Sequence, residues 1–236
     1  MIRYVVISTN DNPDYYQYIP YVIKAWNNLG WKVICFLRGD KKVLNNLLDG
    51  KNFFYYLHGE SKYRDETLVQ VSRLFGAYCF NGLIMTADGD MMPCSDYWNP
   101  SEDEITTYGH DLTGYGHYPI CYIAMNSEKW KQVMNIETGD LMPQIEALLD
   151  NYEQASSNDW YQWWQVDQDI ITEKLKQVNV NSILRGKDGD LARARIDRYD
   201  WNRTKQMNNA IDAHMPRPFD LNEAEFILNK YYGSNT

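Results

Sequence analysis

The stretch of this chain best suited to chemistry is Asp88-Gly89-Asp90, which directly follows the apolar run 83–87. On an extended backbone, side chains two positions apart point the same way, so the two carboxylates would face one ligand together. Carboxylate oxygens suit Mg²⁺ or Mn²⁺, particularly when a diphosphate supplies further oxygens, and Gly89 leaves room for a ligand beside the main chain. The motif therefore indicates a metal site. A plain Asp-Gly-Asp turn is the alternative, because these residues are common in turns.

Three other motifs carry groups that could act on a ligand. Asp167-Gln168-Asp169 opens an apolar helical segment, His214 stands shortly before Arg217-Pro218-Phe219, and Arg73 lies on a helical segment before residue 83. Each also has an ordinary structural explanation. Asp167 could cap a helix, His214 could be a surface or hydrogen-bonded residue, and Arg73 could form a salt bridge.

The elements that must position these groups alternate between strands and helices over the first half of the chain. The run before Asp88 is typical of a strand buried on both faces, and open α/β sheets bind ligands beyond the carboxyl ends of such strands. Pro20 predicts a kink or break in the first helix, and Gly30 is expected as its C-cap. This order predicts βαβ units and an α/β fold, with a mainly parallel sheet flanked by helices. Strands are expected at residues 4–8, 31–37, 53–57 and 83–87, and helices at 14–29, 40–48 and 66–80.

The second half of the chain is less regular. A Gly/Asp-rich loop is expected at 185–190, and neither an internal repeat nor a domain linker interrupts the sequence. Residues 1–236 are therefore expected to form a single domain, which is within the usual size of an α/β domain. A strand is expected at 119–126, helices at 127–135, 139–152 and 221–232, and an aromatic cluster followed by a helix at 160–176.

Composition narrows the class of partner. The chain has 32 Asp plus Glu against 23 Lys plus Arg, a net charge of −9. Nucleic-acid backbones and anionic membrane surfaces both require a basic face, so neither is expected as the main partner. The 19 Tyr and 8 Trp are too many for all to be buried, and exposed rings stack on sugars and bases. A small-molecule or glycan partner is expected.

The four cysteines form no CxxC pair and no zinc spacing, and three of them lie in apolar runs as expected of core thiols. This usage fits a reducing compartment. The N-terminus begins as a strand and lacks the pattern of a signal peptide, and no apolar run approaches the roughly 18 residues that a membrane span needs. We expect a cytoplasmic protein with no membrane span.

Taken in order, the motifs resemble metal-dependent glycosyltransferases of the GT-A (Rossmann-like) fold. The resemblance is closest to the retaining type represented by glycosyltransferase family 8, and to the small glycosyltransferase domains of large algal (chlorella-type) viruses. It covers roughly residues 2–219, and it is compatible with a virus-encoded enzyme acting in a host cell. It implies a nucleotide-binding half at about 1–100 and an acceptor and sugar-binding half at about 101–236. The motifs are 5–11, Arg73-Leu74, Asp88-Gly89-Asp90, 123–126, Asp167-Gln168-Asp169, and His214 with Arg217-Pro218-Phe219.

The resemblance implies a metal and nucleotide site. Asp90 and His214 would bind Mn²⁺ or Mg²⁺ directly, with Asp88 bridging to the metal or to the donor ribose. The donor would be a nucleotide sugar, expected to be UDP-linked. Its uracil and ribose would be held by the loop after the first strand, chiefly Thr9, Asn10 and Asp11.

The resemblance also implies a sugar–phosphate site. Arg217 would contact the diphosphate, and Arg73 would brace the pocket. Gln168 would lie beside the anomeric carbon, where an uncharged amide is compatible with a short-lived ion pair, and Asp167 or Asp169 would hold sugar hydroxyls. As catalytic residues, Gln168, Asp167 and Asp169 are therefore expected.

This sequence departs from the family pattern around His214. Only two residues separate His214 from Arg217, the glycine common there is absent, and Phe219 replaces the usual tryptophan. Arginine also stands where the family usually has lysine, and a planar guanidinium binds phosphate with a different geometry. Retention of configuration is accordingly an expectation from the family alone.

The function implied is transfer of a hexose from a nucleotide diphosphate sugar to a glycan hydroxyl. A sugar nucleotidyltransferase is one alternative, although residues 9–13 lack the glycine-rich basic loop that such an enzyme would show. A non-catalytic glycan-binding module is another, although the intact motifs argue against it. Asp111 would be the candidate base if the enzyme were inverting. Four aromatic residues are expected partly in the core and partly as an acceptor platform: Trp160, Tyr161, Trp163 and Trp164.

Overall fold

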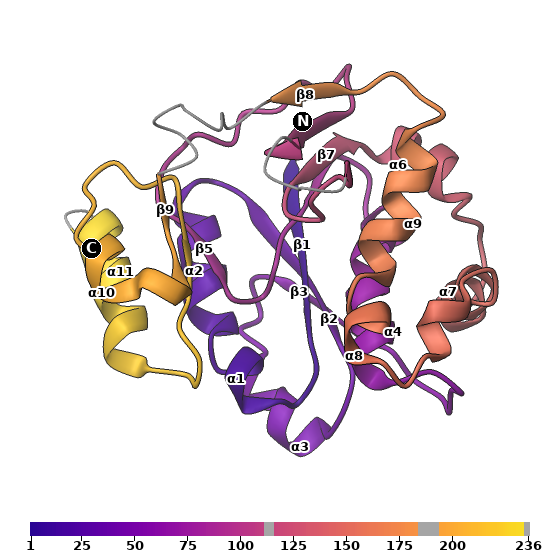
Figure 1. Cartoon of the computed structure of the whole chain (residues 1–236), viewed down its shortest axis with the longest axis horizontal. Coiled ribbons are helices and arrows are strands. Elements are labelled where there is room, and N and C mark those ends of the chain that lie inside the picture. The colour runs from indigo at the N-terminus through magenta and orange to yellow at the C-terminus, as the bar shows by residue number, and fades with distance from the viewer. Residues whose placement is uncertain (111–115, 184–193, 234–236) are drawn as a thin grey trace.

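The computed structural model of the chain describes residues 1–110, 116–183 and 194–233. Its centre is one seven-stranded sheet (Figure 1). The strands β1 to β4 are mutually parallel where they pair, as are β6 and β8, whereas β7 runs antiparallel to both of its neighbours. The predicted α/β fold with a mainly parallel sheet is therefore confirmed. The strand order is β3 (Phe53–Tyr56), β2 (Lys32–Leu37), β1 (Arg3–Thr9), β4 (Leu83–Thr86), β7 (Ile123–Asn126), β6 (Thr106–Tyr108) and β8 (Asn181–Ile183).

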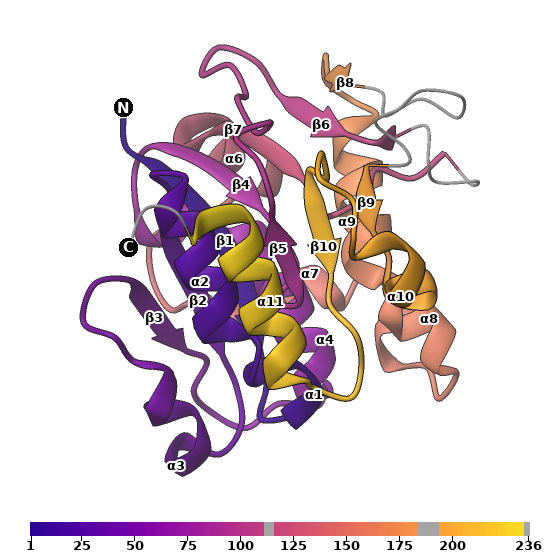
Figure 2. The same cartoon turned by 90° about the vertical axis from the view of Figure 1, so that its left-hand side faces the viewer.

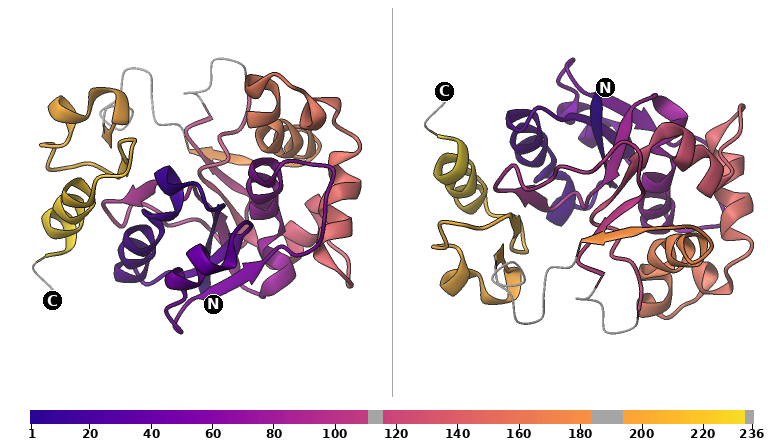
Figure 3. Two further views of the ribbon diagram at one scale, coloured as in Figure 1. Left: turned by 90° about the horizontal axis from the view of Figure 1, so that it is seen from below. Right: turned by 90° about the horizontal axis from the view of Figure 1, so that it is seen from above.

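The sheet is buried on both faces because successive side chains of a strand point to opposite sides. In β1, Val5 and Ile7 belong to one apolar cluster, and Tyr4 and Val6 belong to the other. The two outer layers lie on opposite sides of the sheet, as the yellow and salmon helices show (Figure 3). The first cluster is covered by α2 (Ile19–Asn28) and α11 (Leu221–Tyr232), which lie side by side (Figure 2), and the second by α4 (Asp65–Ser72), α6 (Ser127–Met134), α7 (Leu141–Leu149) and α9 (Val166–Leu175).

Two predicted helices are each divided. The helix expected at 14–29 breaks after α1 (Pro13–Tyr16), and Pro20 sits in the first turn of α2, where its missing N–H needs no partner. The helix expected at 66–80 continues from α4 through the 3-10 segment η2 (Arg73–Phe75) into α5 (Gly76–Cys79). A Cβ on Gly76 would lie 2.4 Å from Cγ2 of Val6, so this segment packs against β1 more closely than a side chain would allow.

A second, three-stranded sheet was not predicted from the sequence. Its central strand β10 (Asp212–His214) pairs antiparallel with β5 (Met91–Pro93) and parallel with β9 (Arg195–Ile196). Strands of two or three residues contain too few alternations for a pattern to reveal them. This sheet nevertheless brings the C-terminal part of the chain next to the residues that follow β4.

The remaining elements are short, and several predicted ones are shorter than expected. The strand expected at 119–126 forms only over β7, the segment 160–176 divides into α8 and α9, and α11 has the predicted bounds. The predicted loop 185–190 lies outside the described residues. All four cysteines are free thiols, and no helix in the described ranges has the length and apolar character to cross a membrane. The other elements are α3 (Lys41–Leu44), η1 (Asn45–Leu47), η4 (Glu153–Ser156), α8 (Trp160–Trp164), η5 (Arg198–Asp200) and α10 (Trp201–Thr204).

Candidate functional site

A cavity of about 570 Å³ opens at the carboxyl ends of β1 and β4. This is the edge of the sheet where α/β proteins bind ligands, as the sequence predicted. Elements from both sheets contribute to its walls. The predicted site residues that line it are Thr9, Asn10, Arg73, Asp88, Asp90, Asp167, Gln168, His214 and Arg217.

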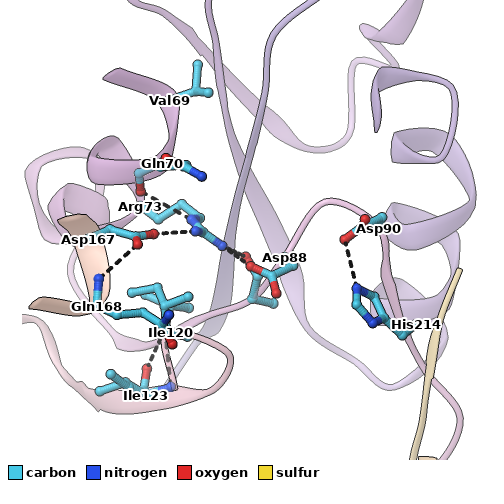
Figure 4. A network of polar contacts seen from close by, with 12 residues as sticks. Val69, Gln70, Arg73, Asp88, Asp90, Ile120, Ile123, Asp167, Gln168 and His214 are labelled. Carbon is cyan, nitrogen blue, oxygen red and sulfur yellow. Dashed lines mark hydrogen bonds and ion pairs between the residues drawn. The ribbon is translucent and has the colours of Figure 1, made fainter. Parts of the chain in front are cut away.

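Arg73 lies between two of the predicted carboxylates (Figure 4). Its Nη1 donates to Asp88, and its Nη2 donates to Oδ2 of Asp167 at 2.5 Å. Burial by itself lowers the pKa of Arg73, but the two carboxylates outweigh it and raise that pKa above its ordinary value. Burial raises the pKa of Asp167, and Arg73 offsets this only in part. The ordinary salt-bridge role considered for Arg73 is therefore present, and it fixes two cavity-lining carboxylates.

Asp90 and His214 meet because of the register between β5 and β10. His214 pairs with Met91 across the antiparallel ladder, and the N–H of Met215 donates to the carbonyl oxygen of Asp90 at 3.0 Å. Nε2 of His214 then lies 4.0 Å from Oδ1 of Asp90 (Figure 4). Asp90 and His214 therefore come together through the pairing of β5 with β10, which the local sequence around neither residue specifies.

The surroundings give Asp90 and His214 the protonation states of metal ligands. Burial lowers the pKa of His214 to about 4, so the imidazole is neutral at pH 7, which is its metal-binding form. Burial opposes ionisation of Asp90, but Arg198, His214 and Arg217 together lower its pKa to about 2. An ionised carboxylate beside a neutral imidazole is a suitable pair of donors for Mn²⁺.

Two arginines already contact Asp90. Nη2 of Arg198 lies 2.5 Å and Nη2 of Arg217 lies 2.7 Å from the same oxygen, Oδ2, which leaves Oδ1 facing His214. The guanidinium carbon of Arg217 also stands 4.0 Å from the ring centre of Tyr15. Asp90 and His214 fit a divalent ion as ligands, provided that the two arginines bind another anion when the metal ion binds.

The expectation that Asp88 and Asp90 share one direction is wrong. The segment is a turn, closed by the N–H of Met91 donating to the carbonyl oxygen of Asp88 at 3.2 Å, and Asp88 turns to Arg73 while Asp90 turns to His214 (Figure 4). A Cβ on Gly89 would lie 2.9 Å from the carbonyl oxygen of Ser8, so the glycine lets the turn pack on β1. Within the described ranges, no three His, Cys, Asp or Glu side chains are grouped as a complete metal site.

Two of the predicted candidates in the described part of the chain, Asp11 and Asp169, do not line the cavity. Asp11 borders a separate hollow, where its Oδ2 accepts a hydrogen bond from the N–H of Asp40 at 2.9 Å. Oδ2 of Asp169 accepts a hydrogen bond from Gln154 at 3.2 Å, because residues two apart on a helix face different sides and Asp167 faces the cavity. Asp111 lies outside the described residues.

The aromatic cluster forms α8 at the mouth of the cavity. No residue of α8 is buried, so the expectation that part of the cluster packs in the core is wrong. Trp160 is 64% exposed and lines the cavity together with Trp163 and Trp164, whereas the neighbouring Tyr161 does not line it. The cluster therefore supplies exposed rings beside the polar site.

Sequence reasoning missed several residues that line the cavity, of which Arg198 and Tyr15 are the most prominent. One signal could have indicated Arg198. Arg193, Arg195 and Arg198 fall close together in a chain with an acidic balance, and such a group of cations is unusual there. No comparable signal distinguishes Tyr15 from the other tyrosines.

Solved glycosyltransferase structures share the fold of this chain. An active-site mutant of LgtC is 13% identical, with a TM-score of 0.55, and the galactosyltransferase LgtC in complex with donor and acceptor sugar analogs is 15% identical, with a TM-score of 0.53. Both matches cover 98% of this chain and 95% of the other. The glycosyltransferase GlyE of Streptococcus pneumoniae TIGR4 is 14% identical, with a TM-score of 0.51, over 98% of this chain and 64% of that one.

Comparisons at the level of sequence find no relative. No protein-family model matches the chain, and no curated protein matches it. At 13–15% identity the likeness to the solved structures shows the fold alone. The predicted resemblance to GT-A glycosyltransferases, including a mainly parallel central sheet flanked by helices, is thus confirmed as a fold.

Proposed function

We propose that this chain is a metal-dependent glycosyltransferase that moves a hexose from a UDP-linked sugar to a glycan hydroxyl, with retention of configuration. One observation carries the proposal. Asp90 and His214 meet in the cavity at the carboxyl edge of a GT-A sheet, with Arg198 and Arg217 against the same carboxylate. These groups suit a divalent cation together with the diphosphate that it neutralises.

The leaving group explains the need for cations. Breaking the bond between a sugar and a diphosphate builds negative charge on the departing nucleotide, while the sugar becomes oxocarbenium-like. Asp90 and His214 would hold Mn²⁺ or Mg²⁺, which supplies Lewis-acid stabilisation of that charge. Arg217 would donate hydrogen bonds to phosphate oxygens, and these are strong because both partners are charged.

The sugar would lie on the opposite side of the cavity, against α9. The Arg73 ion pair holds Asp167 in place, and the N–H of Gln168 donates to Oδ1 of Asp167 at 2.8 Å. Asp167 would accept hydrogen bonds from sugar hydroxyls. Gln168 would present an uncharged amide to the anomeric carbon, which is compatible with departure and attack on the same face. Asp88, held by Arg73, would face the donor ribose.

The nucleoside would occupy the end of β1. Thr9 and Asn10 are buried and line the cavity, and Nδ2 of Asn10 donates to Oε1 of Glu66 at 3.2 Å. Polar groups held in this way can recognise the uracil and ribose. Trp160 stands at the cavity mouth with much of its ring exposed, where it would stack on the apolar face of an acceptor sugar.

The proposal is tested by calorimetric titration of UDP into the protein with Mn²⁺ and then with EDTA. Binding in the micromolar range, on the order of −8 kcal/mol, is expected with Mn²⁺ and should be lost in EDTA. Asp90→Asn, with the same fold by circular dichroism, should bind UDP weakly in both conditions. Absence of UDP binding by the wild-type chain contradicts the proposal, and binding to glycans alone would favour a non-catalytic module. Screening UDP-sugars for hydrolysis then identifies the hexose.

A further inference from the structure

Arg198 is a buried cation that lines the cavity and has a hydrogen-bond donor that no described residue uses. Its side chain is 7% exposed, and its Nη2 donates to Oδ2 of Asp90. Its Nε is buried and has no hydrogen-bond partner among the described residues. A buried donor without a partner costs free energy, and such groups in folded proteins call for an explanation. A ligand oxygen in the cavity would supply the missing acceptor.

Among the residues that the structure describes, Arg198 forms its ion pair with Asp90, and it shares this partner with a second arginine. Arg198 and Arg217 both contact Oδ2 of Asp90. One carboxylate does not neutralise two guanidinium groups. At this contact the two cations outnumber the carboxylate, and this local excess of positive charge beside the buried Arg198 favours an anion next to the two arginines.

The position of Arg198 is set by the second sheet. Arg195 on β9 forms an ion pair of 2.7 Å with Asp212, a fully buried residue of β10, and β9 runs parallel to β10. The carboxylate of Asp197 accepts a hydrogen bond from the N–H of Tyr199 at 3.0 Å and caps the start of η5. Arg198 is therefore held at the same edge of the second sheet as His214, which also faces Asp90.

We propose that Arg198 is a second arginine that binds the donor diphosphate. Until metal and nucleotide bind together, it stays in an ion pair with Asp90. In the chain without ligands, Arg198 and Arg217 neutralise Asp90. On loading, Asp90 turns to the divalent ion, and both guanidinium groups turn to phosphate oxygens. The inference rests on the proposed function, because it takes the anion to be a nucleoside diphosphate.

This exchange predicts that Arg198→Gln strengthens the binding of Mn²⁺ alone and weakens the binding of UDP. Arg198→Gln removes a cation that competes for Asp90, so Mn²⁺ alone should bind several-fold more tightly. The same change removes charged hydrogen bonds to phosphate, so UDP at saturating Mn²⁺ should bind about ten-fold more weakly. Electron paramagnetic resonance of unbound Mn²⁺ measures the first constant, and calorimetry measures the second, so neither depends on turnover.

Arg203→Gln is the matched control. Arg203 lies on the adjacent α10, its side chain is 81% exposed, it pairs with Asp200, and it does not line the cavity. Neither binding constant should change. Arg198→Lys keeps the charge without the planar fork, so it should leave Mn²⁺ binding near the wild-type value and weaken UDP binding several-fold. This variant carries the test if Arg198→Gln fails to fold.

The outcomes separate the inference from the function on which it rests. If the wild-type chain binds no UDP with Mn²⁺, both are overturned. If the wild type binds UDP but Arg198→Gln leaves both constants unchanged, or weakens both, the inference alone is overturned. Unchanged UDP binding in Arg198→Lys overturns it as well.

Discussion

Nη2 of Arg73 donates to Oδ2 of Asp167 across 2.5 Å, and this contact joins the end of α4 to the start of α9. The same guanidinium binds Asp88 beyond β4. One buried cation thus links two helices to the edge of the sheet and aligns two of the carboxylates in the cavity. The stability of the fold and the shape of the site depend on the same group.

Replacing Arg73 should destabilise the fold. Arg73→Met leaves the buried Asp167 without its cationic partner, and breaking a buried pair in this way typically costs about 3–5 kcal/mol. Urea denaturation measures the loss in the free energy of unfolding. Arg203→Gln, which breaks an exposed pair with Asp200, is the control and should have little effect. Equal losses in the two variants would contradict a structural role for Arg73.

Stability should depend on pH through His214. Burial lowers the folded-state pKa of His214 to about 4 from 6.5, so the unfolded chain takes up a proton over this interval and the folded chain does not. The stabilisation is complete above pH 6.5 and is lost as the pH falls towards 4, by on the order of 1–3 kcal/mol. Asp90, with a pKa near 2, stays ionised throughout.

The measurement is the free energy of unfolding at several pH values for the wild type and for His214→Gln. The variant should lack this part of the pH dependence. His58→Gln, at an exposed position, should follow the wild-type curve. If the curves of wild type and His214→Gln run parallel between pH 4 and 6.5, the imidazole is not buried in its neutral form.

Trp160 should contribute to acceptor binding and not to donor binding. Trp160→Ala removes the exposed ring at the cavity mouth, so the KM for a glycan acceptor should rise about ten-fold, which is within the range for loss of a stacking partner. UDP binding with Mn²⁺ should be unchanged. Tyr161→Ala is the control, because Tyr161 is exposed on the same helix but does not line the cavity. An equal rise in KM for both variants would argue against a specific platform.

Substitutions of Asn10 and Asp11 should affect UDP binding differently, although the two residues are adjacent. Asn10→Ala removes a polar group from the cavity wall and should weaken UDP binding about five-fold to ten-fold. Asp11→Ala should leave UDP binding unchanged, because Asp11 points to the backbone N–H of Asp40. Calorimetry with Mn²⁺ checks both. Weaker UDP binding by Asp11→Ala would support the contact between Asp11 and the nucleotide that the sequence predicted.

The order of the elements followed from the sequence because each of the larger ones carries its own pattern. Val5, Val6 and Ile7 are all apolar, which predicts a strand covered on both faces, and the same reasoning applies to the run before Asp88. The motifs that follow such strands could also be placed at one edge of the sheet. The position of Thr9 and Asp88 in the wall of one cavity agrees with that reasoning.

Tertiary contacts decided which groups face one another. Asp90 meets His214 only through the pairing of two three-residue strands, which are too short for any pattern to specify. The Asp-Gly-Asp segment is a turn because Gly89 packs against Ser8, and this separates the carboxylates that an extended backbone would align. Arg198 reaches Asp90 through a sheet built from distant segments. Local sequence specifies how a segment folds, whereas the partner of a charged side chain is set by packing between segments that share no local pattern.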